Sequence, residues 1–424
     1  MAGSILGVEL NNEYSQVSRY VLVDHEPETL DKESENSQIP LAIGIQDGRF
    51  VYGVTAKQLA KVSPEAVAFS FYESALKQES VELSGITYTG VHLLSEYLKL
   101  ILEDFEDIEF LTFSVPYASE DGVKVIKKAA EAAGVLKERI RIQDYRESFC
   151  HYMFYQPKAL WKYESALFSC DGKSMEAHML RGLDIKGKKD TFVIVEEVSK
   201  ATVSDWDIYT PTEAPPDNTS ADERFKTFIQ GVFEKKIVSS VYLTGAGFEN
   251  EWFPESLKVL CNGRRAFLGN NLYSRGACYA AHSMVRKVME TPVYLDEQRL
   301  IHKISMNMAV EGSQSEVLLV PFGVRWYEAD NRIEAILEET ADAEIKIEPL
   351  IGDGAKTEVI SLEGLPGRKD YSLRLQIEVV FLNEECVQLT IRDLGFGDFF
   401  ESSGFEVSKY FFLGGLYGEL YSLS

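Results

Sequence analysis

Residues 373–397 read LRLQIEVVFLNEECVQLTIRDLGFG, and this stretch decides the fold expected for the last third of the chain. Apolar and polar residues alternate from Leu373 to Val379, which is the period-two pattern of a strand with one buried face. The alternation resumes at Val387 after a polar turn at residues 383–385, so the two runs predict a β-hairpin. Because alternation reports burial and not function, an ordinary antiparallel sandwich without a ligand is the simpler explanation of the hairpin alone.

The composition limits the classes of protein to consider. The chain has 424 residues, enough for two or three domains of roughly 100–200 residues each. Hydrophobic residues make up 45% of it, so we expect a sizeable core and no wholesale disorder. The formal net charge of −24 argues against nucleic acid or an anionic membrane as a partner, because both require clustered Lys and Arg side chains.

Neither the cysteines nor the histidines are spaced as metal ligands or as parts of a known catalytic motif. The residues are Cys150, Cys170, Cys261, Cys278 and Cys386, and His25, His92, His151, His178, His282 and His302. Residues 1–13 lack the features of a signal peptide, and no stretch approaches the roughly 18 apolar residues of a membrane span. We therefore expect a soluble protein with reduced, mostly buried thiols in a reducing cytoplasm.

Strand and helix signals alternate in the first half of the chain, which points to an α/β layer. Helices are predicted at residues 89–103 and 120–133, the second closed by Gly134. Strands are predicted at residues 4–10, 19–23, 41–45, 50–54, 108–115 and 238–243. The α/β pattern stops near residue 290, where Thr291-Pro292 marks a candidate linker, and no internal repeat is apparent. Residues 210–220 are rich in proline and predict an exposed loop.

Several of these segments resemble the 70-kDa heat-shock chaperones, which belong to the actin, heat-shock and sugar-kinase ATPase superfamily. The hairpin at residues 373–397 resembles the closing strands of the chaperones' peptide-binding β-domain. Five further segments follow the family's order: residues 48–65 (GRFVYGVTAKQLAKVSPE), 112–135 (TFSVPYASEDGVKVIKKAAEAAGV), 141–154 (RIQDYRESFCHYMF), 245–248 (GAGF) and 276–281 (GACYAA). Together the segments are spread over most of the chain.

The resemblance implies an α/β actin-like (ribonuclease-H-like) two-lobed ATPase fold, followed by a mostly antiparallel β-sandwich domain. Residues 1–290 would form the nucleotide-binding-type domain, whose second lobe is truncated because residues 182–240 are only a short segment in place of a whole subdomain. Residues 291–424 would form the substrate-binding-like sandwich. The family's long helical lid has no counterpart, so a bound peptide would be expected to exchange quickly.

The same resemblance places three nucleotide loops on this sequence. They assign the candidate cofactor-binding residues Gly7, Glu9, Asn11, Asn12, Asp171, Gly172, Gly245 and Gly247. The first two loops depart from the family. Glu13 puts a negative charge where a phosphate would lie, Ser169 replaces the leading aspartate of the second loop, and Tyr145 stands at the family's switch proline. These departures predict that no catalytic residue and no required cofactor remain.

We therefore expect a chaperone-like pseudo-ATPase that acts as a protein- or peptide-binding module. One alternative is a divergent active ATPase, in which Glu9 and Asp171 hold magnesium with ATP or ADP while Asp144 or Glu147 positions water. A second alternative is a scaffolding component of a larger assembly, suggested by the aromatic run at residues 410–423. Magnesium-dependent nucleotide binding and concentration-dependent sedimentation distinguish the three.

Overall fold

A computed structural model describes residues 3–204, 206, 208, 219–249, 252–286, 291–310, 313–337, 342–352, 354–366, 373–397, 400–414 and 420. The predicted loop at residues 210–220 lies outside this set except for its last two residues. The chain divides into two compact units: Met1–Arg181 with Val195–Thr291, and Gly182–Ile194 with Pro292–Ser424. The division after Thr291 falls within the expected linker Thr291-Pro292, but the sequence did not indicate that residues 182–194 belong with the second unit.

The first sheet of unit 1 is mixed and contains the strand that carries Glu9. Its order is β11 (Ile140–Asp144), β10 (Ile108–Val115), β1 (Ser4–Leu10), β2 (Tyr14–Val21) and β3 (Glu26–Thr29), with β4 (Ile39–Pro40) also on β2. The central strand β1 is parallel to β10 and antiparallel to β2. Strand β2 begins five residues before the expected start at residue 19, because polar side chains are buried along its first half.

The second sheet of unit 1 has the same connectivity as the first. Its order is β16 (Arg265–Leu268), β15 (Val238–Thr244), β12 (Glu164–Cys170), β13 (Ser174–Leu183) and β14 (Phe192–Thr202). A sixth strand of the sheet, β17 (Val293–Leu295), belongs to unit 2 and pairs with Phe192–Ile194 of β14. Strand β12 is antiparallel to β13 and parallel to β15, just as β1 is to β2 and β10. The fold therefore contains a structural repeat, which the sequence analysis missed because the two halves share no obvious residue pattern.

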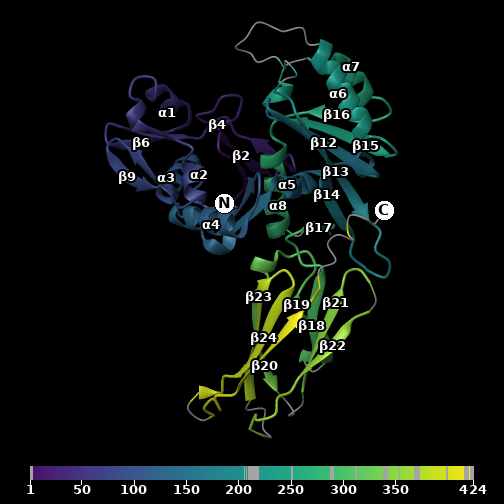
Figure 1. Ribbon diagram of the computed structural model, residues 1–424. Coiled ribbons are helices and arrows are strands. Elements are labelled where there is room, and N and C mark those ends of the chain that lie inside the picture. Colours follow the sequence, from purple (N-terminus) through teal and green to yellow (C-terminus); the bar gives the residue numbers. More distant parts are fainter. Residues whose placement is uncertain are drawn as a thin grey trace. The chain divides into compact units, whose positions relative to one another are not determined.

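Helices cover these sheets and join them. They are α1 (Gly53–Leu59), α2 (Phe71–Leu76), α3 (Gly90–Leu102), α4 (Glu120–Ala132), α5 (Tyr145–Phe154), α6 (Thr219–Val232), α7 (Pro254–Leu260) and α8 (Leu272–Arg286). Helix α8 packs against β1, β10 and α5 (Figure 1). Helices α6 and α7 enclose an aromatic core around Phe168, Phe225 and Trp252. Small sheets β5 (Ala42–Gln46) with β6 (Arg49–Tyr52) and β7 (Val67–Phe69), and β8 (Ser80–Leu83) with β9 (Ile86–Thr89), complete unit 1.

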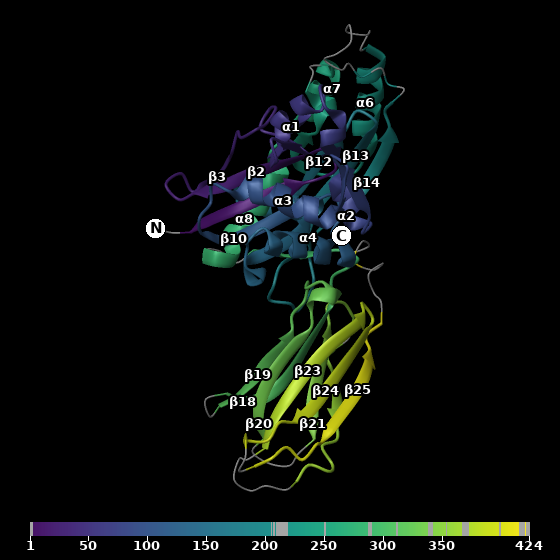
Figure 2. The same ribbon diagram turned by 90° about the vertical axis from the view of Figure 1, so that its left-hand side faces the viewer.

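Unit 2 is sheet-rich, and its two four-stranded sheets share one apolar core. One sheet runs β19 (Ser313–Val320), β18 (His302–Val310), β21 (Ala343–Pro349) and β22 (Lys356–Ile360). The other runs β20 (Asn331–Leu337), β23 (Leu373–Asn383), β24 (Cys386–Asp393) and β25 (Glu406–Phe412), with β23, β24 and β25 side by side in Figure 2. The predicted hairpin is confirmed: Ile377 faces Ile391 across antiparallel β23 and β24, and both side chains are buried.

The coarse fold prediction is thus confirmed as an α/β domain followed by a sheet-rich domain. All five cysteines lie in the described part of the chain outside any disulfide, and all except Cys261 are buried. Among the described residues, no helix combines the length and the apolar character that crossing a bilayer requires.

Candidate functional site

Glu9, the acidic residue of the first predicted phosphate loop, is fully buried near the end of β1. Its Oε1 atom accepts hydrogen bonds from the Tyr14 hydroxyl at 2.8 Å and the Tyr145 hydroxyl at 3.0 Å. Tyr145 opens helix α5, and its ring stacks on Tyr273 of α8 at a centroid distance of 3.9 Å. The carboxylate proposed to organise magnesium is thus enclosed by tyrosines from three separate elements.

The rest of the first loop is held by Asn11. Its Oδ1 atom accepts the backbone N–H groups of Glu13 at 2.8 Å and Tyr14 at 2.9 Å, while its Nδ2 atom donates to the Tyr145 hydroxyl at 3.1 Å. Asn12 and Glu13 lie exposed at the tip of the turn. Asn11 therefore closes the turn with its Oδ1 atom and links it to helix α5 with its Nδ2 atom.

Burial dominates the electrostatics around Glu9. It raises the pKa of the Glu9 carboxyl from 4.5 to about 7, although the tyrosine hydrogen bonds oppose the shift. The pKa values of Tyr14, Tyr145 and Tyr273 are raised, first by burial and then by the charge of Glu9, so these hydroxyls stay protonated. The Glu9 Oε2 atom accepts no hydrogen bond from any residue that the structure describes.

Gly7 serves the packing of a helix. A Cβ atom on Gly7 would clash with the backbone of Ser274 and Cys278 in α8. The same helix meets α5 closely, since a Cβ atom on Gly276 would clash with the carbonyl oxygen of Ser148. The glycine that the resemblance assigned to a phosphate is therefore needed for helix contact whether or not a ligand binds.

The second predicted loop folds back on its own aspartate. The Asp171 Oδ1 atom accepts the backbone N–H groups of Lys173 at 2.7 Å and Ser174 at 2.6 Å, and Gly172 has a φ of +85°. Partial burial opposes ionisation, yet the hydrogen bonds from Ser174 and Lys173 hold the pKa of Asp171 below its usual value. This is a self-capped turn between β12 and β13.

The third predicted loop packs against the second. Gly245 has a φ of +101°, and a Cβ atom there would clash with the carbonyl oxygen of Cys170, the neighbour of Asp171. A Cβ atom on Gly247 would clash with the Cys170 side chain, and the Gly245 N–H donates to Asn270 Oδ1 at 2.9 Å. The structure thus brings the second and third loops together.

The two residues proposed to position water in the ATPase alternative have structural partners. Asp144 caps helix α5 by accepting the Glu147 backbone N–H at 2.8 Å. The buried Glu147 carboxylate pairs with Arg141 at 2.5 Å. Both carboxylates therefore stabilise the junction of β11 and α5.

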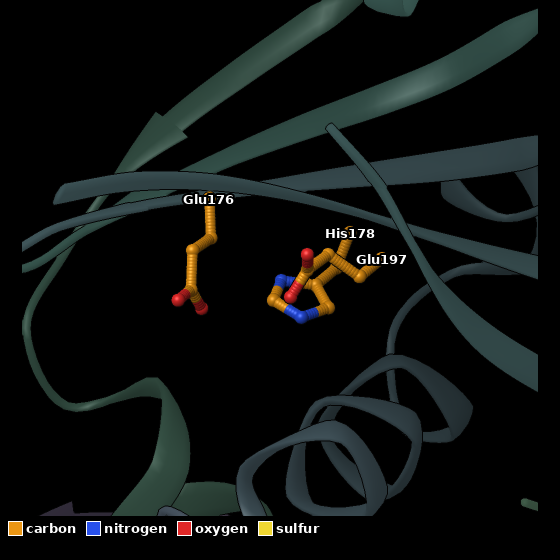
Figure 3. Close-up of side chains that lie close together, drawn as sticks. All are labelled: Glu176, His178 and Glu197. Atoms are coloured by element: carbon orange, nitrogen blue, oxygen red, sulfur yellow. The ribbon is translucent and has the colours of Figure 1, made fainter. Parts of the chain in front are cut away.

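The structure also assembles a group that the sequence analysis did not identify. Glu176 and His178 lie on β13 and Glu197 on β14, and one ligand atom from each lies within 4.8 Å of the others (Figure 3). Burial lowers the pKa of His178 to about 4. The sequence did hold one signal, because residues i and i+2 of a strand share a face, but the partner strand of Glu197 could not be read from spacing.

Two family models match the chain, and residues 182–194 of unit 2 fall within the first match. Residues 25–297, more than half of the chain, match the model described as "Family of unknown function (DUF5716) C-terminal". The chain belongs to this family. Residues 299–413 match the "Domain of unknown function (DUF8552)". A comparison with curated proteins found no match.

The DUF5716 match contains most of the candidate residues. Asp171, Gly172, Gly245 and Gly247 lie inside it, as does the Glu176 cluster, whereas Gly7 to Asn12 precede its first residue. The DUF8552 match covers the strands of the sandwich from β18 to β25 almost completely. The two families thus meet close to the division between the two units.

Proposed function

We propose that this protein is a non-catalytic relative of the 70-kDa heat-shock chaperones, which binds a protein or peptide through its β-sandwich. In this proposal the two sheets of unit 1 are the two ribonuclease-H-like lobes of an actin-like fold. Support comes from the five strands that follow the same order in the two sheets and from the close contact of α5 with α8. The second sheet would then belong to the truncated second lobe, in which the segment 182–240 is short.

The observation that carries the proposal is the tyrosine enclosure of Glu9. A phosphate loop offers backbone N–H groups and carboxylates that hold hydrated magnesium. Here Glu9 is buried, bonded to two tyrosine hydroxyls, and has a pKa near 7, so it is a poor magnesium ligand. The first and second loops are also closed by hydrogen bonds of Asn11 and Asp171. Unit 1 would then support the β-sandwich without hydrolysing ATP.

The sandwich offers a strand edge for a peptide. Among the described strands, β25 pairs with β24 alone, and the outer side chains Tyr410 and Phe412 are 53% and 83% exposed. An extended peptide can add to such an edge through backbone hydrogen bonds, while alternate side chains give specificity. The exposed aromatic rings would contribute apolar contact to a partner strand.

Calorimetry of the full chain with ATP and ADP, with and without magnesium, tests whether unit 1 binds nucleotide. We expect no binding up to millimolar nucleotide. Micromolar, magnesium-dependent binding would instead establish the ATPase alternative and direct mutagenesis to Glu9 and Asp171.

Fluorescence anisotropy with a library of extended apolar heptapeptides tests the sandwich. Phe412→Glu should weaken peptide binding about tenfold or more, because it puts a charge at the proposed contact. Ile237→Glu changes a similarly exposed apolar residue in unit 1 and should leave binding unchanged. Equal affinities of the two variants, or no peptide binding at all, would remove the sandwich proposal. Self-association in sedimentation that Phe412→Glu abolishes would favour the scaffold alternative.

A further inference from the structure

The cluster of Glu176, His178 and Glu197 has the donor set of a metal site. All three side chains project from the same side of two neighbouring strands, with the Glu197 carboxylate beside the imidazole (Figure 3). Adjacent strands hold their backbones rigidly, so ligands at i and i+2 of one strand and on its neighbour keep a fixed spacing. None of the three side chains caps a helix or closes a turn.

His178 lacks the partner that a largely buried imidazole normally has. Within the described residues, its ring nitrogens make no hydrogen bond and no ion pair, although the side chain is only partly accessible to water. A polar group in such a place costs free energy unless something satisfies it. The nearest ligand atoms are the two carboxylates, which accept and cannot donate when ionised, so a neutral imidazole gains from them only through its single N–H.

The two carboxylates have different surroundings, and each leaves an oxygen atom that could bind an ion. Glu176 Oε1 accepts a hydrogen bond from Lys200 Nζ at 2.5 Å, which orients this carboxylate and leaves Oε2 for another partner. Glu197 is exposed and has no hydrogen-bonded or ion-paired partner among the described residues, so its carboxylate is available. Its exposure also lets the side chain move inward.

We propose that Glu176, His178 and Glu197 bind one divalent transition-metal ion of the zinc class. An imidazole with two carboxylates suits zinc, whereas magnesium and calcium take oxygen ligands. Bonds of about 2.0–2.2 Å would bring the ligand atoms to roughly 3–3.5 Å from one another, somewhat closer than in the present arrangement. Small rotations of the two carboxylate side chains, Glu176 above all, would supply this change. Water would complete the coordination.

Titration calorimetry with zinc chloride tests the site in the full chain. The protein should carry Cys261→Ser, because Cys261 is the exposed thiol of the chain and would bind zinc by itself. After dialysis against a chelator, we expect one ion to bind with micromolar or tighter affinity, and millimolar magnesium not to displace it. His178→Gln and Glu197→Gln should each weaken binding about tenfold to 100-fold.

Matched controls separate this site from adventitious binding. His25→Gln and Glu234→Gln remove an exposed histidine and an exposed carboxylate elsewhere in unit 1, and both should bind zinc like the parent. If His178→Gln alters the thermal melt, the exposed Glu197→Gln carries the test. The proposal is overturned if the parent does not bind zinc, or if Glu197→Gln binds it as tightly as the two controls. Neither result depends on nucleotide or peptide binding.

Discussion

Glu9 makes stability depend on pH through its burial. The folded state holds a proton on Glu9 up to a pKa of about 7, whereas the unfolded state releases it near 4.5. At this group the folded state therefore binds more protons between these values, and the contribution of Glu9 to the free energy of unfolding falls as the pH rises through this interval. The fall should amount to about 3 kcal/mol, since one pKa unit corresponds to about 1.4 kcal/mol.

Glu9→Gln should remove this pH dependence, because glutamine keeps the shape and the acceptor oxygen for Tyr14 and Tyr145 but does not titrate. Urea unfolding at pH 4.5 and pH 8 measures the difference between variant and parent. From pH 4.5 to pH 8, the free energy of unfolding of Glu9→Gln should rise by about 3 kcal/mol relative to that of the parent. Glu13→Gln, at an exposed position in the same loop, is the control. If the free energies of unfolding of Glu9→Gln and the parent differ by the same amount at both pH values, Glu9 is not a buried carboxyl that keeps its proton.

At the residue scale, the sequence predicted the burial of apolar side chains better than the burial of polar ones. The alternation that placed Ile377 and Ile391 inside needs only local spacing. Ser18 and Gln16 are equally buried on β2, but their partner Ser274 lies more than 250 residues away. Tyr145 and Tyr273 likewise meet only in the fold, so no spacing could show that they enclose Glu9.

At the scale of secondary-structure elements, Asp222 links helix α6 to helix α7. It lies on α6 at 5% exposure, and its carboxylate accepts the backbone N–H groups of Glu255 and Ser256 at 2.8 Å, which begin α7. Asp222→Ala should lower the free energy of unfolding by about 2–3 kcal/mol, because it removes a cap and leaves buried donors unsatisfied. Urea unfolding checks this. Glu223→Ala removes only an exposed ion pair and should change stability by less than about 0.5 kcal/mol; equal losses would refute the capping role.

Replacing a glycine with alanine should have opposite effects on stability in helices α8 and α6. Gly276→Ala places a methyl group against the Ser148 carbonyl and should destabilise the protein by about 3 kcal/mol, since neither α5 nor α8 can move freely. Gly231→Ala adds a methyl group on α6 with nothing within 4 Å and should stabilise by about 0.5–1 kcal/mol. Thermal melts compare the two, and a neutral Gly276→Ala would show that α5 and α8 pack less closely than described.

Elements with strong local signals were predicted closely. The expected helix at residues 89–103 is α3 (Gly90–Leu102), and the expected strand at residues 108–115 is β10. Thr89 caps the first and Gly134 ends α4 at a φ of +100°, both readable from residue type. The early start of β2 was missed because Ser15 and Gln16 interrupt the apolar pattern while remaining in the sheet.

At the scale of the whole molecule, unit 2 includes a segment from the middle of the chain. Phe192–Ile194 pairs with β17 (Val293–Leu295), and Lys188 Nζ bonds Glu348 at 2.7 Å and the Pro349 carbonyl at 2.8 Å. Leu183, Phe192 and Ile194 also share a small apolar cluster with Leu295, Ile301, Leu350 and Leu420. No pattern in the sequence indicated this pairing, and the resemblance assigned residues 182–240 wholly to the first domain.

Residues 292–424 expressed alone should therefore fold in part. The main sandwich core lies entirely between Leu300 and Phe411, so the β23–β24 hairpin should keep its slow hydrogen exchange. Strand β17 loses its only described partner strand, and its amides should exchange at nearly the rate of an unfolded chain. Mass spectrometry of hydrogen exchange, with the full chain as reference, measures both. A peptide of residues 182–194 added in trans should restore the protection of β17, because it supplies the missing strand and the side chains of Phe192 and Ile194. Full protection of β17 without that peptide would mean that residues 182–194 contribute nothing to the stability of unit 2.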